Sequence, residues 1–293
     1  MMFEKPMNND LPRSQDWRRF LESIGGSEFV VGVASRASQA ILDIYQRPVI
    51  EHGVKADGSP VSEADLASAS LIEEALGETK IPVVCEEGML PDITGCSLFW
   101  LVDPLDGTKE FLNRNGEFCV NIALMAGNEP VAGVIAVPVT GEVFVGVRGK
   151  GSKRVLNGVE TSITNERTTS EYIGVASRSF VSSEADAWLE QFGVAKILRC
   201  GSAIKFCRLA EGTADIFLRL GRTMEWDTAA GQIIIEEAGC RLTTLPSRER
   251  MLYGKPTFAN GDFIAARNDI QVRWEPSTSL SPVLERASSQ RGR

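Results

Sequence analysis

The chain has 293 residues, with 39 Asp and Glu against 31 Lys and Arg, and a formal net charge of −8. This balance argues against nucleic-acid binding, which needs a basic surface, but it allows a small anionic ligand held by local cations. The sequence contains no apolar run long enough to cross a membrane and no apolar signal-peptide core near its start. We therefore expect a cytoplasmic protein without an integral membrane segment.

The first half of the chain predicts two helices followed by an antiparallel meander. Residues 27–46 carry apolar side chains at helical spacing, and a second helix is expected from Ser62 to about Leu76 with Gly77 as its C-cap. Short apolar strands are expected at 81–85 and 98–103. The alternating segments 117–125, 130–139 and 142–148 then predict the meander.

The second half alternates strands and helices, which is typical of an α/β lobe. Strands are expected at 172–177, 195–200 and 214–219, and helices at 182–193, 202–212 and 225–239. We place a boundary near residue 160. The predicted organisation is an N-terminal lobe over 1–160, a C-terminal α/β lobe over 161–275 and a flexible tail over 276–293, so the fold class is α+β or α/β.

The stretch VDPLDGTKEF, residues 102–111, places two aspartates three positions apart after an apolar run. Pro104 holds Asp103 in an extended conformation, and we expect the chain to bend directly afterwards. Asp106 and the next two residues then open a short helix. Taken alone, this stretch is more typical of an ordinary turn followed by an Asp N-cap than of a functional site.

Three further acidic residues stand at predicted strand ends and helix starts. Glu86 follows the apolar strand IPVVC, and Asp227 opens the apolar helix DTAAGQIII. Asp65 is the third residue after Ser62, which is the spacing of a capping box. Helix capping or a solvated loop would explain each acid by itself. Together they predict one acidic cleft, since the ends of strands and helices are where α/β proteins build clefts.

Clustered carboxylates without histidine favour a hard cation, Mg²⁺ rather than Zn²⁺. His52 is the single histidine and lies in a predicted surface loop, which argues against a Ser-His-Asp triad or a zinc site. Two Mg²⁺ ions about 4 Å apart can clamp the attacking and leaving oxygens of a phosphoryl transfer. The amides of Gly107 and Thr108, at a helix start, would complete an anion site. The residues thus predict a site for a phosphate ester.

Four motifs together resemble the inositol-monophosphatase-like superfamily of magnesium-dependent, lithium-sensitive phosphatases: SPVSEAD (59–65), CEEG (85–88), VDPLDGT (102–108) and EWDTAAG (225–231). Within it, residues 99–124 and 201–231 are similar to the bacterial 3′(2′),5′-bisphosphate nucleotidases of the CysQ type. The similarity extends from about residue 27 to 270. It implies a layered α-β-α-β-α sandwich of the inositol monophosphatase and fructose-1,6-bisphosphatase type.

The resemblance also implies roles for individual residues. The ligands of two or three Mg²⁺ ions would be Glu86, Asp103, Asp106, Asp227 and the main-chain carbonyl of Leu105. Asp65 would act on a further, weaker metal or its water. Thr108, with Glu86 or Asp65, would orient and deprotonate the attacking water, while the amides of Gly107 and Thr108 hold the phosphate.

Substrate binding would involve the same cavity and three additional residues. Ser202, Lys205 and Arg219 match positions that hold a second phosphate in nucleotidases of this group, although Lys205 is also compatible with a surface lysine. The implied substrate contacts are Glu86, Leu105, Asp106, Gly107, Thr108, Ser202, Lys205, Arg219 and Asp227. Two positions bear on specificity. Leu220 stands where inositol enzymes place an acid, and Phe180 stands where the CysQ type is expected to have histidine.

Our first hypothesis is a Mg²⁺-dependent hydrolase that removes the 3′-phosphate of adenosine 3′,5′-bisphosphate, leaves AMP and clears a by-product of sulfate assimilation. The same chemistry on an inositol or sugar phosphate is an alternative. So are an aspartyl-phosphate phosphatase with Asp103 as nucleophile, disfavoured by the D-x-x-D spacing, and a non-catalytic nucleotide-binding protein of the same fold. The protein is expected to be a monomer or homodimer, and the resemblance allows a peripheral position on the cytoplasmic face of the inner membrane.

Overall fold

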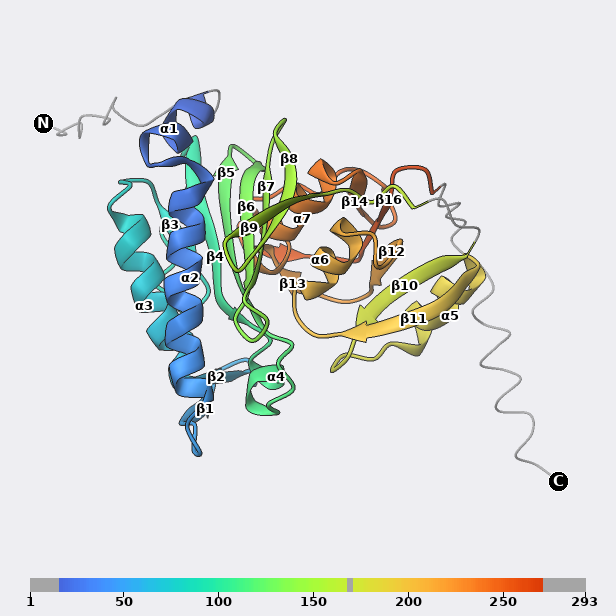
Figure 1. The fold of residues 1–293 in the computed structure, drawn as a ribbon, viewed down its shortest axis with the longest axis horizontal. Helices are drawn as coiled ribbons and strands as arrows, with labels where there is room; N and C mark the ends of the chain where they lie inside the picture. The colour runs from blue at the N-terminus through green and yellow to red at the C-terminus, as the bar shows by residue number, and fades with distance from the viewer. Residues whose placement is uncertain (1–15, 168–170, 271–293) are drawn as a thin grey trace, which may run out of the picture.

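The computed structural model describes residues 16–167 and 171–270, so the predicted tail lies outside the described residues. Its elements form five layers (Figure 1). Three helices cover one face of a seven-stranded sheet, two helices fill the space between this sheet and a five-stranded sheet, and a last helix covers the outer face of the second sheet. This is the α-β-α-β-α arrangement predicted from the sequence. No helix among the described residues has the length and apolar character needed to cross a membrane.

The outer helical layer contains α1 (Trp17–Ser23), α2 (Gly26–Tyr45) and α3 (Glu63–Gly77). The two predicted helices are confirmed, and Ser62 and Asp65 form the predicted capping box at the start of α3. Gly77 was predicted as the C-cap of α3, which is wrong. It is the last helical residue, and Glu78 follows it in a right-handed helical conformation.

The seven-stranded sheet has its strands in sequence order: β3 (Val83–Cys85), β4 (Leu98–Asp106), β5 (Cys119–Ala126), β6 (Glu129–Val137), β7 (Glu142–Val147), β8 (Gly151–Leu156) and β9 (Val159–Ile163). Strand β3 pairs with β4 in parallel, and the other neighbours pair antiparallel. The meander is confirmed, and β8 and β9 extend it beyond the segments we predicted. The lobe boundary near residue 160 stays a prediction.

The bend expected directly after Asp103 is not found. Strand β4 continues to Asp106, and its pairing with β5 shifts register between Asp103 and Asp106. The irregularity accommodates Pro104, which has no N–H to donate to a regular ladder. The short helix α4 (Thr108–Leu112) then begins as predicted, after Gly107 in a left-handed conformation with φ of 95°.

The five-stranded sheet has the order β11-β10-β12-β16-β14. Its bounds are β10 (Tyr172–Ser177), β11 (Val194–Cys200), β12 (Ile216–Arg219), β14 (Cys240–Thr244) and β16 (Phe263–Arg267). The three predicted strands β10, β11 and β12 pair in parallel, and β16 and β14, which we did not predict, pair antiparallel. Two small antiparallel sheets pair β1 (His52–Val54) with β2 (Pro60–Ser62) and β13 (Thr223–Met224) with β15 (Ala259–Asn260).

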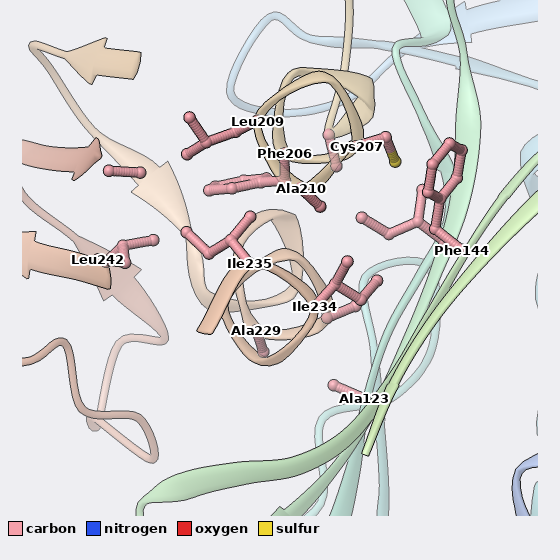
Figure 2. Packing of buried hydrophobic residues seen from close by; sticks show 14 of the residues in the cluster. Ala123, Phe144, Phe206, Cys207, Leu209, Ala210, Ala229, Ile234, Ile235 and Leu242 are labelled. Atoms are coloured by element: carbon pink, nitrogen blue, oxygen red, sulfur yellow. The ribbon is translucent and has the colours of Figure 1, made fainter. Parts of the chain in front are cut away.

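Three predicted helices of the second half are confirmed as α5 (Ser183–Gln191), α6 (Ile204–Ala210) and α7 (Ala229–Glu237). Helices α6 and α7 lie between the sheets, where Ile234 and Ile235 pack among Phe206, Phe144 and Leu242 (Figure 2). The helix predicted to begin at 225 begins later. Asp227 belongs to a 3₁₀ turn, Glu225–Asp227, that precedes α7.

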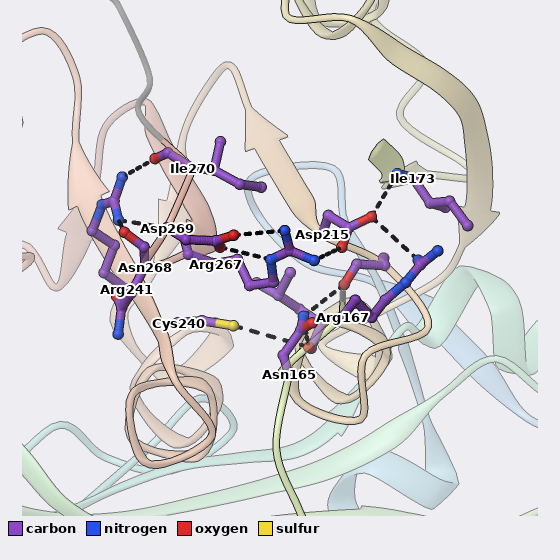
Figure 3. A network of polar contacts seen from close by, with 12 residues as sticks. Asn165, Arg167, Ile173, Asp215, Cys240, Arg241, Arg267, Asn268, Asp269 and Ile270 are labelled. Atoms are coloured by element: carbon purple, nitrogen blue, oxygen red, sulfur yellow. Dashed lines mark hydrogen bonds and ion pairs between the residues drawn. The ribbon is translucent and has the colours of Figure 1, made fainter. Parts of the chain in front are cut away.

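A buried ionic network fixes the five-stranded sheet (Figure 3). The carboxylate of Asp215 is fully buried and accepts hydrogen bonds from Arg267 Nη1 at 2.9 Å and Arg167 Nη1 at 3.2 Å. It also accepts from the backbone N–H of Ile173 at 2.7 Å, at the start of β10. Because Arg167 and Arg267 pair with Asp215, and Arg267 also pairs with Asp269, we assign the network a structural role.

Candidate active site

Glu86 and Asp103 emerge side by side because of how β3 and β4 pair. Cys85 lies opposite Val102 in the parallel register, and the backbone N–H of Glu86 donates to the carbonyl of Val102 at 3.1 Å. The next residue on each strand is an acid, so two carboxylates reach the same edge of the sheet. The parallel register of the two strands therefore brings together the carboxylates of Glu86 and Asp103, as the sequence predicted.

Asp227 reaches the same place from the second half of the chain. Its Oδ2 accepts a hydrogen bond from the backbone N–H of Met224 at 2.7 Å, which orients the carboxylate at the 3₁₀ turn. One oxygen from each of Glu86, Asp103 and Asp227 lies within 4.8 Å of the other two. The structure thus gathers three of the four predicted acidic ligands into one cluster, which we call the carboxylate cluster.

Asp106, the fourth predicted acid, lies beside the carboxylate cluster. Its Oδ2 accepts hydrogen bonds from the backbone N–H of Ala203 at 2.5 Å and from Asn121 Nδ2 at 3.2 Å. Desolvation raises the pKa of Asp106 to about 6, although the positive charge of Lys205 and these hydrogen bonds oppose the rise. The hydrogen bond from the Ala203 N–H to Asp106 Oδ2 connects Asp106 to the second half of the chain.

The electrostatics of the carboxylate cluster call for a cation. Burial raises the pKa of Asp103 well above its usual value, and repulsion from Glu86 and Asp106 raises it further. Burial and the negative charge of Asp106 do the same to the pKa of Asp227. A divalent cation would offset this repulsion. The available donors are carboxylate oxygens without nitrogen or sulfur, so the site fits Mg²⁺.

Thr108 and Asp65 form a pair behind the cavity wall. Thr108 Oγ1 donates to Asp65 Oδ1 at 2.9 Å, while Asp65 Oδ2 accepts from the N–H and the hydroxyl of Ser62. The side chain of Asp65 is buried, and this burial raises its pKa. Thr108 lines the cavity. Asp65 lies outside the lining and is connected to the cavity by its hydrogen bond with Thr108. The capping interaction predicted for Asp65 and its contact with Thr108 therefore exist together.

Two cations enter the same cavity, and among residues 16–167 and 171–270 neither has a carboxylate partner within hydrogen-bonding distance. Lys205 is 7% exposed, and its Nζ donates to the backbone carbonyls of Ser202 at 2.5 Å and Cys200 at 3.5 Å. Arg219 donates weakly to Ser177 Oγ at 3.4 Å, and its buried Nε has no hydrogen-bond partner among the described residues. The surface-lysine reading of Lys205 is therefore wrong, and burial lowers the pKa of its ammonium group.

The carboxylate cluster, Asp106, Thr108, Lys205 and Arg219 surround one cavity of about 460 Å³. Its lining includes every predicted substrate-binding residue: Glu86, Leu105, Asp106, Gly107, Thr108, Ser202, Lys205, Arg219 and Asp227. The cavity is large enough for a small organic phosphate. Leu220 lies outside this lining and packs against a hydrophobic cluster instead, so the position offers no carboxylate to the cavity.

The two halves of the chain approach closely at this cavity. A Cβ added to Gly107 would lie 3.2 Å from the Cβ of Ser202, and one added to Gly201 would lie 2.6 Å from the carbonyl oxygen of Glu117. Glycine is needed at both positions because a side chain would push the segments apart. Ser202 itself has a φ of 49°, a left-handed conformation that lets the chain turn into α6.

Sequence reasoning missed two polar residues of the site. Lys55, on the loop between β1 and β2, donates to Glu86 Oε1 at 2.7 Å and also contacts Glu87. Nothing in its local sequence distinguishes it from a surface lysine. Asn121 holds Asp106 from β5, and its signal was available, since it is a polar residue on a strand that is otherwise apolar.

Comparisons with known proteins agree with this architecture. The inositol monophosphatase family profile matches residues 26–281. The 3′(2′),5′-bisphosphate nucleotidase CysQ of Salmonella typhimurium is 38% identical over an alignment of 246 residues, and the match covers 80% of this chain and 97% of that protein. The protein of the same name from Escherichia coli strain K12 is 36% identical over 244 residues, covering 80% and 96% of the two chains.

A solved structure extends the agreement to three dimensions. The crystal structure of CysQ from Bacteroides thetaiotaomicron, described as a bacterial member of the inositol monophosphatase family, matches with a TM-score of 0.74 and 36% identity. The match covers 82% of this chain and 96% of that chain. With the layered fold, the carboxylate cluster and these similarities in hand, we conclude that this chain belongs to the inositol monophosphatase family.

Proposed function

We propose that this protein is a Mg²⁺-dependent 3′(2′),5′-bisphosphate nucleotidase that converts adenosine 3′,5′-bisphosphate and water to AMP and phosphate. The observation that carries the proposal is that one cavity holds both the carboxylate cluster and two cations, Lys205 and Arg219, that form no ion pair with a carboxylate in the described part of the chain. The names of the CysQ relatives support the same activity. Removal of a sulfate-assimilation by-product would be the cellular role of this reaction.

A substrate with two separated phosphates suits this charge distribution. The 3′-phosphate would lie at the carboxylate cluster, beside the amides of Gly107 and Thr108. The second phosphate would meet Lys205 and Arg219 with the hydroxyl of Ser202, since charge-assisted hydrogen bonds to phosphate are stronger than neutral ones. Both cations are already partly desolvated, so little water has to be removed when the phosphate binds.

Mg²⁺ held by the carboxylate cluster, Asp106 and the Leu105 carbonyl would lower the pKa of water and offset negative charge on the phosphate. Thr108 commits its hydroxyl hydrogen to Asp65, so the lone pairs of Thr108 Oγ1 remain free to accept a hydrogen bond from the attacking water. The water proton would pass through Thr108 to Asp65. The water oxygen then bonds to phosphorus and the bond from phosphorus to O3′ breaks. O3′ takes a proton from solvent water, and Asp65 returns to solvent the proton that it received.

Two alternatives fit the cavity less well. An inositol phosphatase would need a group at position 220 to bind sugar hydroxyls, and Leu220 is instead packed in a hydrophobic cluster. A phospho-aspartyl mechanism would need the Asp103 carboxylate free to attack phosphorus, whereas it belongs to the carboxylate cluster that would hold the metal and accepts a hydrogen bond from the Leu105 N–H at 3.1 Å. The number of Mg²⁺ ions, a monomeric or dimeric state, and any contact with the inner membrane stay predictions.

A phosphate-release panel tests the proposed substrate. Adenosine 3′,5′-bisphosphate should be hydrolysed with a kcat/KM at least ~100-fold above that for inositol 1-phosphate, because the second phosphate gains two charged contacts of roughly 1.5–3 kcal/mol each. Activity should vanish in chelator and return with Mg²⁺. Faster turnover of inositol 1-phosphate, or equal turnover with and without Mg²⁺, would contradict the proposal.

Replacing Asp106 tests the metal site. Asp106→Asn should lower kcat by at least ~100-fold, since charge held by a metal site lowers the barrier by several kcal/mol. The asparagine keeps an oxygen to accept from Ala203 and Asn121, so the variant should fold. Asp92→Asn, at an exposed loop carboxylate that accepts from the Thr94 N–H, is the matched control and should be fully active. A normally active Asp106→Asn variant would remove the argument for metal binding here.

The proposed proton path predicts non-additive losses. Thr108→Val should lower kcat by about 100-fold or more, within the usual range for loss of acid–base assistance, whereas Thr108→Ser keeps the hydroxyl and should stay within about tenfold of wild type. Asp65→Asn should behave like Thr108→Val. If the two residues act as one unit, the double variant is no slower than the slower single variant. Multiplicative losses in the steady-state rates would show that they act separately.

A further inference from the structure

Phe180 is a large aromatic residue left exposed at the rim of the catalytic cavity. Its side chain is 54% exposed and lines the same cavity as the carboxylate cluster. Two cations approach the ring. Lys109 Nζ lies 4.4 Å from the ring centroid and Arg219 Cζ lies 5.3 Å from it. An exposed phenyl ring keeps apolar surface in water, and a flat ligand that covers the ring would remove that surface from water.

The segment before Phe180 is fixed on both sides. Arg178 forms two hydrogen bonds with the carboxylate of Glu117, at 2.5 Å and 2.6 Å. Ser179 Oγ donates to Glu110 Oε1 at 2.5 Å, and Glu110 is buried next to the cavity. These contacts anchor the segment to α4 and to the loop that follows it. The backbone that carries Phe180 is thereby fixed before any ligand arrives, which lowers the entropic cost of binding.

We propose that Phe180 is the platform on which the nucleobase of the substrate stacks, and that the protein recognises the base by stacking and not by hydrogen bonds. The inference rests on the proposed nucleotidase function and names its specificity-determining residue. Arg219 connects the two parts of the substrate site, since it contacts the ring and also lines the phosphate-binding cavity. A nucleotide would then lie with its base at the rim and its phosphates deeper inside.

The contacts of Phe180 allow this stacking. Lys109 is exposed and carries its charge on a flexible side chain, so a base can take its place over the ring. A cation–π contact at an exposed site is weaker than the stacking of a base on an aromatic ring. A phenyl ring has no hydrogen-bond donor or acceptor, and every base presents a π-face. Stacking on Phe180 therefore favours substrates that have a base without selecting strongly among bases.

The test compares a substrate that has a base with one that lacks it. Phe180→Ala should lower kcat/KM for adenosine 3′,5′-bisphosphate by about 10-fold or more, the usual cost of losing a stacking partner. The same variant should change kcat/KM for ribose 3,5-bisphosphate, which has the phosphates but no base, by less than about twofold. Phe180→Tyr and Phe180→Trp keep a stacking surface and should restore turnover of the nucleotide. Val181→Ala, at the exposed neighbour that does not line the cavity, is the matched control.

A second arm tests the absence of base selection. Guanosine, inosine and cytidine 3′,5′-bisphosphates should be hydrolysed by the wild-type protein within about tenfold of the adenosine compound. Discrimination of more than ~100-fold among the purines would contradict recognition by stacking alone, because it requires hydrogen bonds to the base.

The outcomes separate this inference from the function on which it rests. Equal losses on the nucleotide and on ribose 3,5-bisphosphate in Phe180→Ala would show that the ring only shapes the cavity, and would overturn the inference. An unchanged nucleotide kcat/KM in that variant would also overturn it. In both cases the wild-type activity, and with it the proposed function, would stand. A wild-type protein that releases no phosphate from any of the nucleotides would instead overturn the proposed function itself.

Discussion

Mutual repulsion among carboxylates held away from bulk water is the constraint on which this structure depends. Asp103 is buried, and Asp106 and Asp227 lie close enough to raise its pKa further. A fold seldom brings such charges together without a positive partner, because unpaired charge in a desolvated site is costly. Lys55 offsets part of this charge at Glu86, and a metal ion would supply further positive charge at the place where a phosphate must be neutralised.

Both halves of the chain contribute carboxylates to this cluster. Strands β3 and β4 place Glu86 and Asp103 at the edge of the first sheet. The 3₁₀ turn before α7 places Asp227 beside them from the second half of the chain. Helix α7 is packed between both sheets, so the position of Asp227 depends on the whole sandwich. The two halves of the chain also meet at the cavity rim, where Arg178 and Ser179 anchor the segment carrying Phe180 to the first half of the chain.

Much of this architecture could be predicted from the sequence, since strong periodicity fixed α2, the meander and the parallel strands β10 to β12. The convergence of Glu86, Asp103 and Asp227 was predictable too, because Glu86 and Asp103 end apolar strands and Asp227 precedes an apolar helix. Other features depended on pairing that no local pattern encodes. Strand β4 continues through Pro104 because its neighbours hold it, against the turn that the local sequence favours. Lys55 meets Glu86 across 31 positions of sequence, and a single lysine in a polar loop gives no signal of such a contact.

The most direct test of the central claim is thermal unfolding with and without Mg²⁺. The wild-type Tm should rise when Mg²⁺ is added, because the ion binds the folded state and relieves the repulsion. In chelator, Asp103→Asn should unfold at a higher temperature than wild type, since one of the repelling charges is gone, and Mg²⁺ should raise its Tm little or not at all. If Mg²⁺ stabilises Asp103→Asn as strongly as it stabilises the wild type, the carboxylates do not share a cation and the account is contradicted.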